Sequence, residues 1–192
     1  MLYSKKFKKF KKINHCFFTK KGGFSKGIYK SLNCGRGSMD KRKNIYKNLT
    51  LVSKKIKVKK NKLLLMHQTH SNKVKIINNK SKNLKKINSD SIVTNIKGIA
   101  VGVVTADCVP IILYDIRNEI IGCIHAGWKG SLNGIIENTI NKFKKISPDN
   151  NIYACVGPCI GKKSYEVSLD FSKNFIAKSK KNAIYFTKKN KK

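Results

Sequence analysis

Three side chains that can bind a metal ion lie at the ends of predicted strands. They are His70, Cys108 and His125, in the segments HQTH (67–70), TADC (105–108) and HAGW (125–128). A sheet holds a strand end rigidly and leaves it open to solvent, which suits a functional site. Zinc favours imidazole and thiolate ligands, and three protein ligands leave a fourth position for water, whose pKa zinc lowers to about 7. If folding gathers these positions, they form a catalytic zinc (Zn²⁺) site.

The same residues have plainer interpretations. The spacing His-x-x-His is a common accident, and a lone cysteine after a buried strand is more often packed in the core than bound to a metal. Another alternative is a nucleophilic pair, in which Cys108 attacks and His125 or His70 acts as its base. Cys155 and Cys159 could also bind a metal or pair with each other. Spacing alone leaves these alternatives open.

A candidate anion site follows one of these segments. The sequence GWKG at 127–130 precedes a predicted helix start, where backbone N–H groups and the helix dipole attract an anion. Lys129 beside it could hold a phosphate group. The alternative is a glycine-mediated turn with a solvated lysine. No segment matches the glycine-rich pattern of a P-loop or a dinucleotide-binding turn.

Apolar runs in the centre of the chain predict the strands that must position these side chains. They are rich in Val and Ile and nearly continuous, which implies burial on both faces of a sheet and therefore layers on either side. Asp40 and Ser131 are candidate caps for two of the helices. Strands are predicted at 15–19, 63–66, 74–77, 91–94, 99–105, 110–114, 119–124 and 151–156, and helices near 41–55, 132–146 and 168–178.

Length and composition predict one domain. The chain has 192 residues, of which 40% are hydrophobic, enough for a single core. We expect a flexible basic arm at 1–13, one catalytic domain at 14–187 and a disordered tail at 188–192. No apolar run is long enough to span a bilayer, and no apolar segment follows the basic N-terminus. The sequence therefore predicts a cytoplasmic protein without a membrane partner, and leaves its oligomeric state open.

The formal net charge of +34 suggests nucleic-acid binding, because a basic surface attracts phosphate. Only Arg36, Arg42 and Arg117 among the 43 basic residues are arginines, the side chain that base recognition favours. The lysines are spread along the whole chain, as a drift in amino-acid usage would produce. We therefore expect no specific nucleic-acid partner, and a basic nucleic-acid-associated non-enzyme remains an alternative.

Several motifs, in this order, resemble the YfiH family. They are FFT (17–19) with GG (22–23), GIYKSLN (27–33), QTHS (68–71), TADCVP (105–110), HAGWKG (125–130), GPCIG (157–161) and YEV (165–167). Members of this family were long called laccase-like polyphenol oxidoreductases. They are now described as purine nucleoside phosphorylases with adenosine deaminase activity. The resemblance covers residues 15 to about 176.

The resemblance implies a fold and an activity. The fold is α+β, a four-layer α/β/β/α sandwich in a single domain, related to the cysteine hydrolase fold of the CNF type. The activity is zinc-dependent phosphorolysis of adenosine, inosine or methylthioadenosine to a free base and a ribose 1-phosphate type of product, together with deamination of adenosine. The partners are purine nucleosides and phosphate. Alternatives attached to the same family are a copper-dependent polyphenol oxidase and a hydrolase that edits peptidoglycan precursors.

The resemblance also implies roles for single residues. The metal ligands are His70, Cys108 and His125, whereas His67 is not a ligand. Asp107, beside Cys108, is the candidate for proton transfer. Asn33 and Gln68 are candidate substrate contacts near the metal. For the phosphate of such a reaction, the candidate binding residues are Lys129 and Arg36.

This sequence departs from the family pattern at three places. Lys129 stands where many members carry arginine, which replaces planar bidentate anion binding by a point charge. Leu49, after Asn48, stands where many members carry arginine. Family members usually continue past the last residue of this sequence, with a strand-rich segment rich in Phe, Ser and Arg. We expect either that this segment is missing or that the sequence is a fragment, which bears on the completeness of the sheet and the pocket.

Overall fold

The computed structural model describes residues 1–81, 84 and 87–188. The chain divides into two compact units, Met1–Cys159 and Ile160–Lys192. The single domain predicted over 14–187 spans both units, and its extent stays a prediction. Residues 189–192 of the predicted tail lie outside the described residues. None of the helices described is both long enough and apolar enough to cross a membrane.

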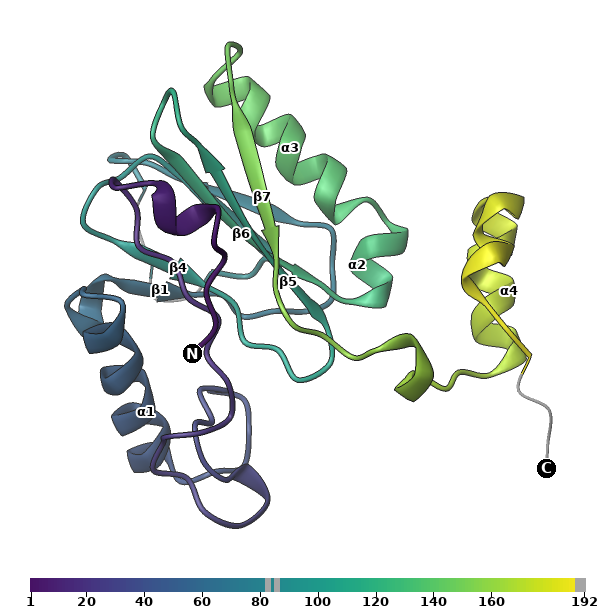
Figure 1. The fold of residues 1–192 in the computed structure, drawn as a ribbon, viewed down its shortest axis with the longest axis horizontal. Coiled ribbons are helices and arrows are strands. Elements are labelled where there is room, and N and C mark those ends of the chain that lie inside the picture. The colour runs from purple at the N-terminus through teal and green to yellow at the C-terminus, as the bar shows by residue number, and fades with distance from the viewer. Residues whose placement is uncertain (82–83, 85–86, 189–192) are drawn as a thin grey trace. The chain divides into compact units, whose positions relative to one another are not determined.

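A five-stranded sheet forms the centre of the first unit (Figure 1). Its edge strand β2 is parallel to β3, and all other neighbours are antiparallel. Each of these strands overlaps one of the apolar runs that were predicted to be strands. In spatial order the strands are β2 (Val74–Ile77), β3 (Ser91–Thr94), β6 (Ile120–Ala126), β5 (Val109–Asp115) and β7 (Ile152–Val156).

A second, two-stranded parallel sheet pairs β1 (Leu63–Leu65) with β4 (Ala100–Gly102). The α-helices are α1 (Arg42–Lys55), α2 (Trp128–Leu132), α3 (Ile135–Ile146) and α4 (Leu169–Lys178). Short 3₁₀ helices occupy Phe7–Lys9, Gly27–Tyr29, Lys60–Lys62, Lys162–Ser164 and Lys180–Tyr185.

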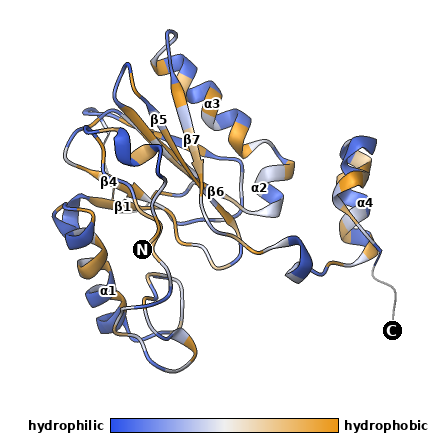
Figure 2. Cartoon of the chain, viewed as in Figure 1, coloured by the Kyte–Doolittle hydropathy of each residue, from blue (hydrophilic) through white to orange (hydrophobic). Residues whose placement is uncertain are grey.

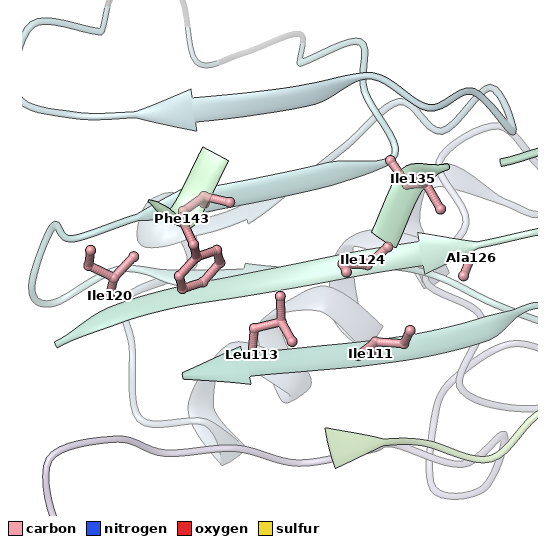
Figure 3. Close-up of a cluster of buried hydrophobic side chains, with 8 residues drawn as sticks. Ile111, Leu113, Ile120, Ile124, Ala126, Ile135 and Phe143 are labelled. Atoms are coloured by element: carbon pink, nitrogen blue, oxygen red, sulfur yellow. The ribbon is translucent and has the colours of Figure 1, made fainter. Parts of the chain in front are cut away.

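Three apolar clusters show that the first unit is layered α/β/β/α, as predicted. The first lies between α3 and the large sheet and includes Phe143 and Ile124 (Figure 3). The second lies between the two sheets, where Ile77 and Ile92 meet residues of β1 and β4. The third packs Leu49 and its neighbours on α1 against the small sheet. Both helices turn a hydrophobic stripe inward and a hydrophilic face outward (Figure 2).

The structure corrects two predicted helix starts. Ser131 does not cap a helix but lies inside α2, where its N–H bonds the carbonyl of Gly127. A new helix, α3, begins after Gly134, whose φ of 80° is readily adopted only by residues such as glycine. Asp40 is not the N-cap of α1, because Lys41 occupies that position.

The N-terminal segment packs on the large sheet, although the sequence predicted a flexible arm at 1–13. Phe7 is 1% exposed. The ring of Phe10 lies 5.3 Å from that of Tyr114 on β5 and 5.0 Å from that of Tyr153 on β7. The aromatic side chains interspersed with the lysines account for this packing. The predicted strand at 15–19 is reduced to one antiparallel bridge between Leu2 and Phe17.

In the second unit, α4 confirms the helix predicted near 168–178. The hydroxyl of Ser168 accepts a hydrogen bond from the N–H of Phe171 at 3.2 Å and caps the helix. Phe175 contacts both Phe171 and Phe186, with ring centroids 5.1 and 5.7 Å away. These aromatic contacts fold the following segment back onto the helix.

Candidate metal centre

Three elements of the first unit bring His70, Cys108 and His125 together. One ligand atom from each residue lies within 4.8 Å of the other two. Cys108 immediately precedes β5, and His125 lies near the end of the antiparallel strand β6. His70 arrives on the loop between β1 and β2. The hairpin register therefore sets the positions of Cys108 and His125, whereas a separate loop brings the third side chain.

The geometry and chemistry of the cluster fit a metal ion. Cys108 Sγ lies 3.7 Å from His70 Nε2. Around a tetrahedral zinc ion, a sulfur and a nitrogen ligand stand about 3.6 Å apart, given typical Zn–S and Zn–N lengths. His125 is buried, Cys108 is half-buried and His70 is exposed, so the cluster is anchored in the protein and open on one side. An open side is typical of catalytic metal sites.

Asp90 orients His125. The carboxylate is fully buried directly before β3, and its Oδ1 lies 2.8 Å from Nδ1 of His125. Burial tends to raise the pKa of Asp90, but hydrogen bonds from Ser71, His125 and the backbone outweigh it and hold that pKa below its usual range. An ionised carboxylate in this position accepts a proton from Nδ1, and that tautomer would leave Nε2 of His125 bare to bind a metal ion.

Asp90 also holds the loop that carries His70. Its two oxygens accept backbone N–H groups of Thr69, His70 and Ser71 at 3.2, 3.0 and 2.8 Å. The hydroxyl of Ser71 adds a fourth bond at 2.6 Å. These bonds support the backbone of His70, whose φ of 57° lies in the left-handed region that non-glycine residues rarely adopt.

Gly127 leaves room for two ligands. A Cβ atom at this position would lie 2.5 Å from Cδ2 of His70 and 3.2 Å from Sγ of Cys108. Its φ of −73° is ordinary, so the glycine is required for close approach and not for backbone conformation. Gly127 of the HAGW segment therefore belongs to the site because it lacks a side chain.

Gln68 ties the His70 loop to the segment that leads to Cys108. Its amide donates to the carbonyl of Val104 and accepts from the N–H of the same residue, both at 2.8 Å. The resemblance implied a substrate contact for Gln68. In the structure, both polar atoms of its side chain are engaged with the backbone.

The remaining predicted site residues belong to two parts of the chain. Asp107 precedes Cys108, Lys129 follows His125 by four residues, and both are exposed. The ammonium group of Lys129 lies 5.3 Å from the Trp128 ring centroid. Asn33 bonds within its own loop, to Ser38, Asp40 and the N–H of Gly35. Arg36 is exposed on that loop. Substrate contacts by these residues stay predictions.

The electrostatics of Cys108 favour a cation beside it. Burial raises the pKa of its thiol, and the neighbouring charges of Asp107 and Asp90 raise that pKa further. A coordinated metal ion reverses this effect, because a thiol that binds a metal loses its proton. The negative charges of Asp107 and Asp90 disfavour an isolated Cys108 thiolate, but the same charges attract a metal cation, which would stabilise that thiolate.

Sequence reasoning missed Asp90 as a site residue. The signal was present: Asp90 is a single acidic residue directly before a strand that is buried along its whole length. A carboxylate in such a position needs partners, since an unpaired buried charge is costly. His67 lies outside the His70–Cys108–His125 cluster that the described residues form.

Comparison with known proteins places most of the chain in one family. Residues 14–192 match a family model described as multi-copper polyphenol oxidoreductase laccase. A protein of Haemophilus influenzae named purine nucleoside phosphorylase is 31% identical over 176 residues, covering 92% of this chain and 70% of that protein. A Bacteroides thetaiotaomicron protein of the same name is 31% identical over 164 residues, covering 81% of this chain and 61% of that protein.

Solved structures share the fold. The crystal structure of Neisseria meningitidis protein NMB0706 matches with a TM-score of 0.73 and 28% identity, over 86% of this chain and 65% of that one. The Bacillus licheniformis hypothetical protein YfiH matches with a TM-score of 0.74 and 26% identity, over 84% of this chain and 62% of that one. The chain thus spans about three fifths of the length of several proteins that it resembles.

Proposed function

The chain belongs to the multi-copper polyphenol oxidoreductase laccase family, and we propose that it is a zinc-dependent purine nucleoside phosphorylase with adenosine deaminase activity. The observation that carries the proposal is the meeting of His70, Cys108 and His125 at open strand ends, with ligand atoms within 4.8 Å of one another. The substrate class is supported by relatives named purine nucleoside phosphorylase at 31% identity.

The three ligands would hold a zinc ion with one position open. When bound, zinc would act as a Lewis acid and lower the pKa of a coordinated water molecule to about 7. His125 contributes Nε2, because its Nδ1 proton is held by Asp90 at 2.8 Å. The exposed side of the cluster, at His70, admits the substrate.

In phosphorolysis, the chain's role is to place phosphate against the ribose. An oxygen of phosphate forms a bond to the anomeric carbon, and the bond from that carbon to the purine nitrogen breaks. The electron pair of the broken bond goes to the purine, which takes up a proton and leaves as the free base. Lys129, an exposed cation four residues after His125, binds the phosphate and holds it for attack, and Arg36, exposed on the loop of Asn33, is the second candidate for this role.

In deamination, the chain's role is to move protons. The oxygen of a water molecule forms a bond to the purine carbon that bears the amino group, and the amino group leaves as ammonia. Asp107 takes a proton from the water and delivers one to the departing nitrogen. Its carboxylate is exposed next to Cys108, within one residue of the metal centre.

Copper-dependent oxidation of phenols is a second candidate, favoured by the description of the matching family. A Cys/His/His set binds copper as well as zinc, and divalent copper binds such sites more tightly. The described residues form a single cluster of this kind, whereas oxygen reduction by multicopper enzymes uses several copper ions. Elemental analysis of protein purified without added metal separates the two candidates.

The deciding experiment is to incubate the purified chain with adenosine, with and without phosphate, and identify the products. Free adenine that requires phosphate indicates phosphorolysis, and inosine indicates deamination. His70→Ala should abolish both zinc content and turnover. His67→Ala is the matched control, because His67 is also exposed, lies three residues away and is outside the cluster. A His70→Ala protein that keeps its turnover without zinc would contradict the proposal.

A further inference from the structure

One buried carboxylate touches two of the three metal-binding segments. Asp90 is 0% exposed and lies directly before β3, which carries no member of the cluster. Its Oδ1 faces Nδ1 of His125 at 2.8 Å and accepts the N–H of His70 at 3.0 Å. In addition, the backbone carbonyl of Asp90 accepts the N–H of His125 at 2.8 Å. Asp90 therefore holds both the ring and the backbone of His125.

The two oxygens of Asp90 face donors only. Oδ2 accepts from the N–H and hydroxyl groups of Ser71, at 2.8 and 2.6 Å, and from those of Thr69, at 3.2 and 3.4 Å. Oδ1 faces the His70 N–H and the His125 ring. A carboxylate has acceptor sites on both oxygens and no donor, so it suits all of these partners at once.

We propose that Asp90 is a positioning residue that sets the His125 tautomer and the path of the His70 loop together, so that zinc affinity depends on this one carboxylate. The proposal rests on the proposed function only in taking zinc as the metal. Two ligands would be aligned by a single group that does not itself touch the ion. Loss of such a partner typically weakens metal binding about 10- to 100-fold.

The substitution Asp90→Asn separates this role from simple packing, because it keeps the shape and removes one acceptor. The amide oxygen will take the Oδ2 position, where four donor groups of Thr69 and Ser71 converge. The amide NH₂ then faces Nδ1 of His125 and forces that nitrogen to accept. The ring proton moves to Nε2, the atom that must be bare to bind a metal.

The matched control is Asp115→Asn. Asp115 is also 0% exposed, and its carboxylate also accepts backbone N–H groups, from Arg117 and Asn151 at 3.1 and 3.0 Å. It lies at the opposite end of β5 from Cys108, about 20 Å along the strand. The same chemical change at this site should lower stability but leave zinc affinity unaltered.

Zinc affinity of the full chain is measured by competition with a chromophoric chelator, after metal removal and stepwise addition of Zn²⁺. We expect Asp90→Asn to bind zinc about 10- to 100-fold more weakly than the wild type. Asp115→Asn should stay within about twofold, which is a small free-energy difference. Equal affinities for Asp90→Asn and the wild type would overturn the proposal.

A second measurement needs no variant at position 90 and covers the case in which Asp90→Asn fails to fold. Two-bond ¹⁵N–¹H correlations of the metal-free wild type report the tautomer of each of the four histidines, with His125 assigned by its absence in His125→Gln. We expect the His125 proton on Nδ1. A proton on Nε2 in the wild type would contradict the proposal.

These readouts are independent of turnover. If Asp90→Asn binds zinc more weakly and the His125 proton of the wild type lies on Nδ1, but no purine nucleoside is converted, the inference holds and the proposed reaction fails. If purine nucleosides are converted but Asp90→Asn binds zinc as tightly as the wild type, the reaction holds and the inference fails.

Discussion

The side chain of Gln68 and the backbone of Val104 exchange two hydrogen bonds, each 2.8 Å long. The pair joins the loop of His70 to the segment that ends at Cys108, two regions 36 residues apart in the chain. Because each partner donates once and accepts once, neither segment can shift along the other without breaking both bonds. The distance between His70 and Cys108 is therefore set in part by a residue that was expected to touch substrate.

Replacing Gln68 by alanine tests that role. We expect a loss of about 1–3 kcal/mol in the free energy of unfolding, since the backbone groups of Val104 lose their partners. Zinc affinity should fall as well, because the Cys108 segment is released. Urea denaturation and chelator competition measure the two effects. A raised KM for adenosine with unchanged stability and zinc affinity would instead support the substrate contact.

A methyl group at position 127 should displace the metal ligands. In Gly127→Ala the new Cβ would meet Cδ2 of His70 at 2.5 Å, far inside van der Waals contact. The backbone conformation suits alanine, so the clash alone is tested. We expect zinc affinity to fall by at least about tenfold, as for other disturbances of ligand support. Gly37→Ala is the control, because a Cβ there meets nothing within 4 Å. A Gly127→Ala protein with wild-type zinc affinity would contradict this prediction, because it would show that the cluster accommodates the methyl group without weaker zinc binding.

The buried amide of Asn48 fixes the loop that carries Asn33 and Arg36. Asn48 is 0% exposed on α1, accepts the N–H of Phe24 at 2.8 Å and donates to the carbonyl of Asn33 at 2.7 Å. Asn48→Ala leaves these buried groups unpaired and should destabilise the protein by about 2–4 kcal/mol. Lys43→Ala, on the exposed side of the same helix, should change stability by less than about 0.5 kcal/mol.

The same variant tests whether this loop binds substrate. If Asn33 and Arg36 contact the nucleoside or phosphate, Asn48→Ala should raise KM at a temperature where it stays folded, while zinc affinity stays constant. An unchanged KM would argue against a substrate role for the loop.

Stability should fall in mild acid because of His15. Burial lowers the pKa of this imidazole below its ordinary 6.5, and the charge of Lys8 lowers it further. Its Nε2 accepts the N–H of Ser4 at 2.9 Å, between the rings of Tyr3 and Phe7. The unfolded chain binds a proton near pH 6.5, whereas the folded chain does so only at lower pH. The contribution of His15 is thus present above pH 6.5 and is lost as pH falls toward the folded pKa.

The measurement compares wild type with His15→Gln by urea denaturation at pH 7.5 and pH 5. Glutamine can accept the same N–H and does not titrate. The wild type should lose more stability on acidification than the variant, by at most about 1.4 kcal/mol per pH unit for one proton. Parallel losses in both proteins would assign the acid sensitivity to other groups.

Local sequence determined most of the secondary structure. The strands Val74–Ile77 and Ser91–Thr94 have the bounds that their apolar runs predicted, and α1 begins within one residue of its predicted start. The spacing of Ile135 and Phe143 also identified the buried face of α3. The break before α3 was missed, although Gly134 marks it in the sequence. These features follow from propensity and periodicity, which act over a few residues.

The family resemblance implied that His70, Cys108 and His125 share one metal ion, but their spacing in the chain could not show how they meet. Their meeting depends on the register of β5 against β6, in which Pro110 pairs with His125, and on the loop between β1 and β2. The partners of Asp90 could not be predicted for the same reason, because they lie from 19 to 35 residues away. The sequence determines which side chains could bind a metal ion. The distances between them depend on strand pairing and buried hydrogen bonds between residues far apart in the chain, and these form only when the protein folds.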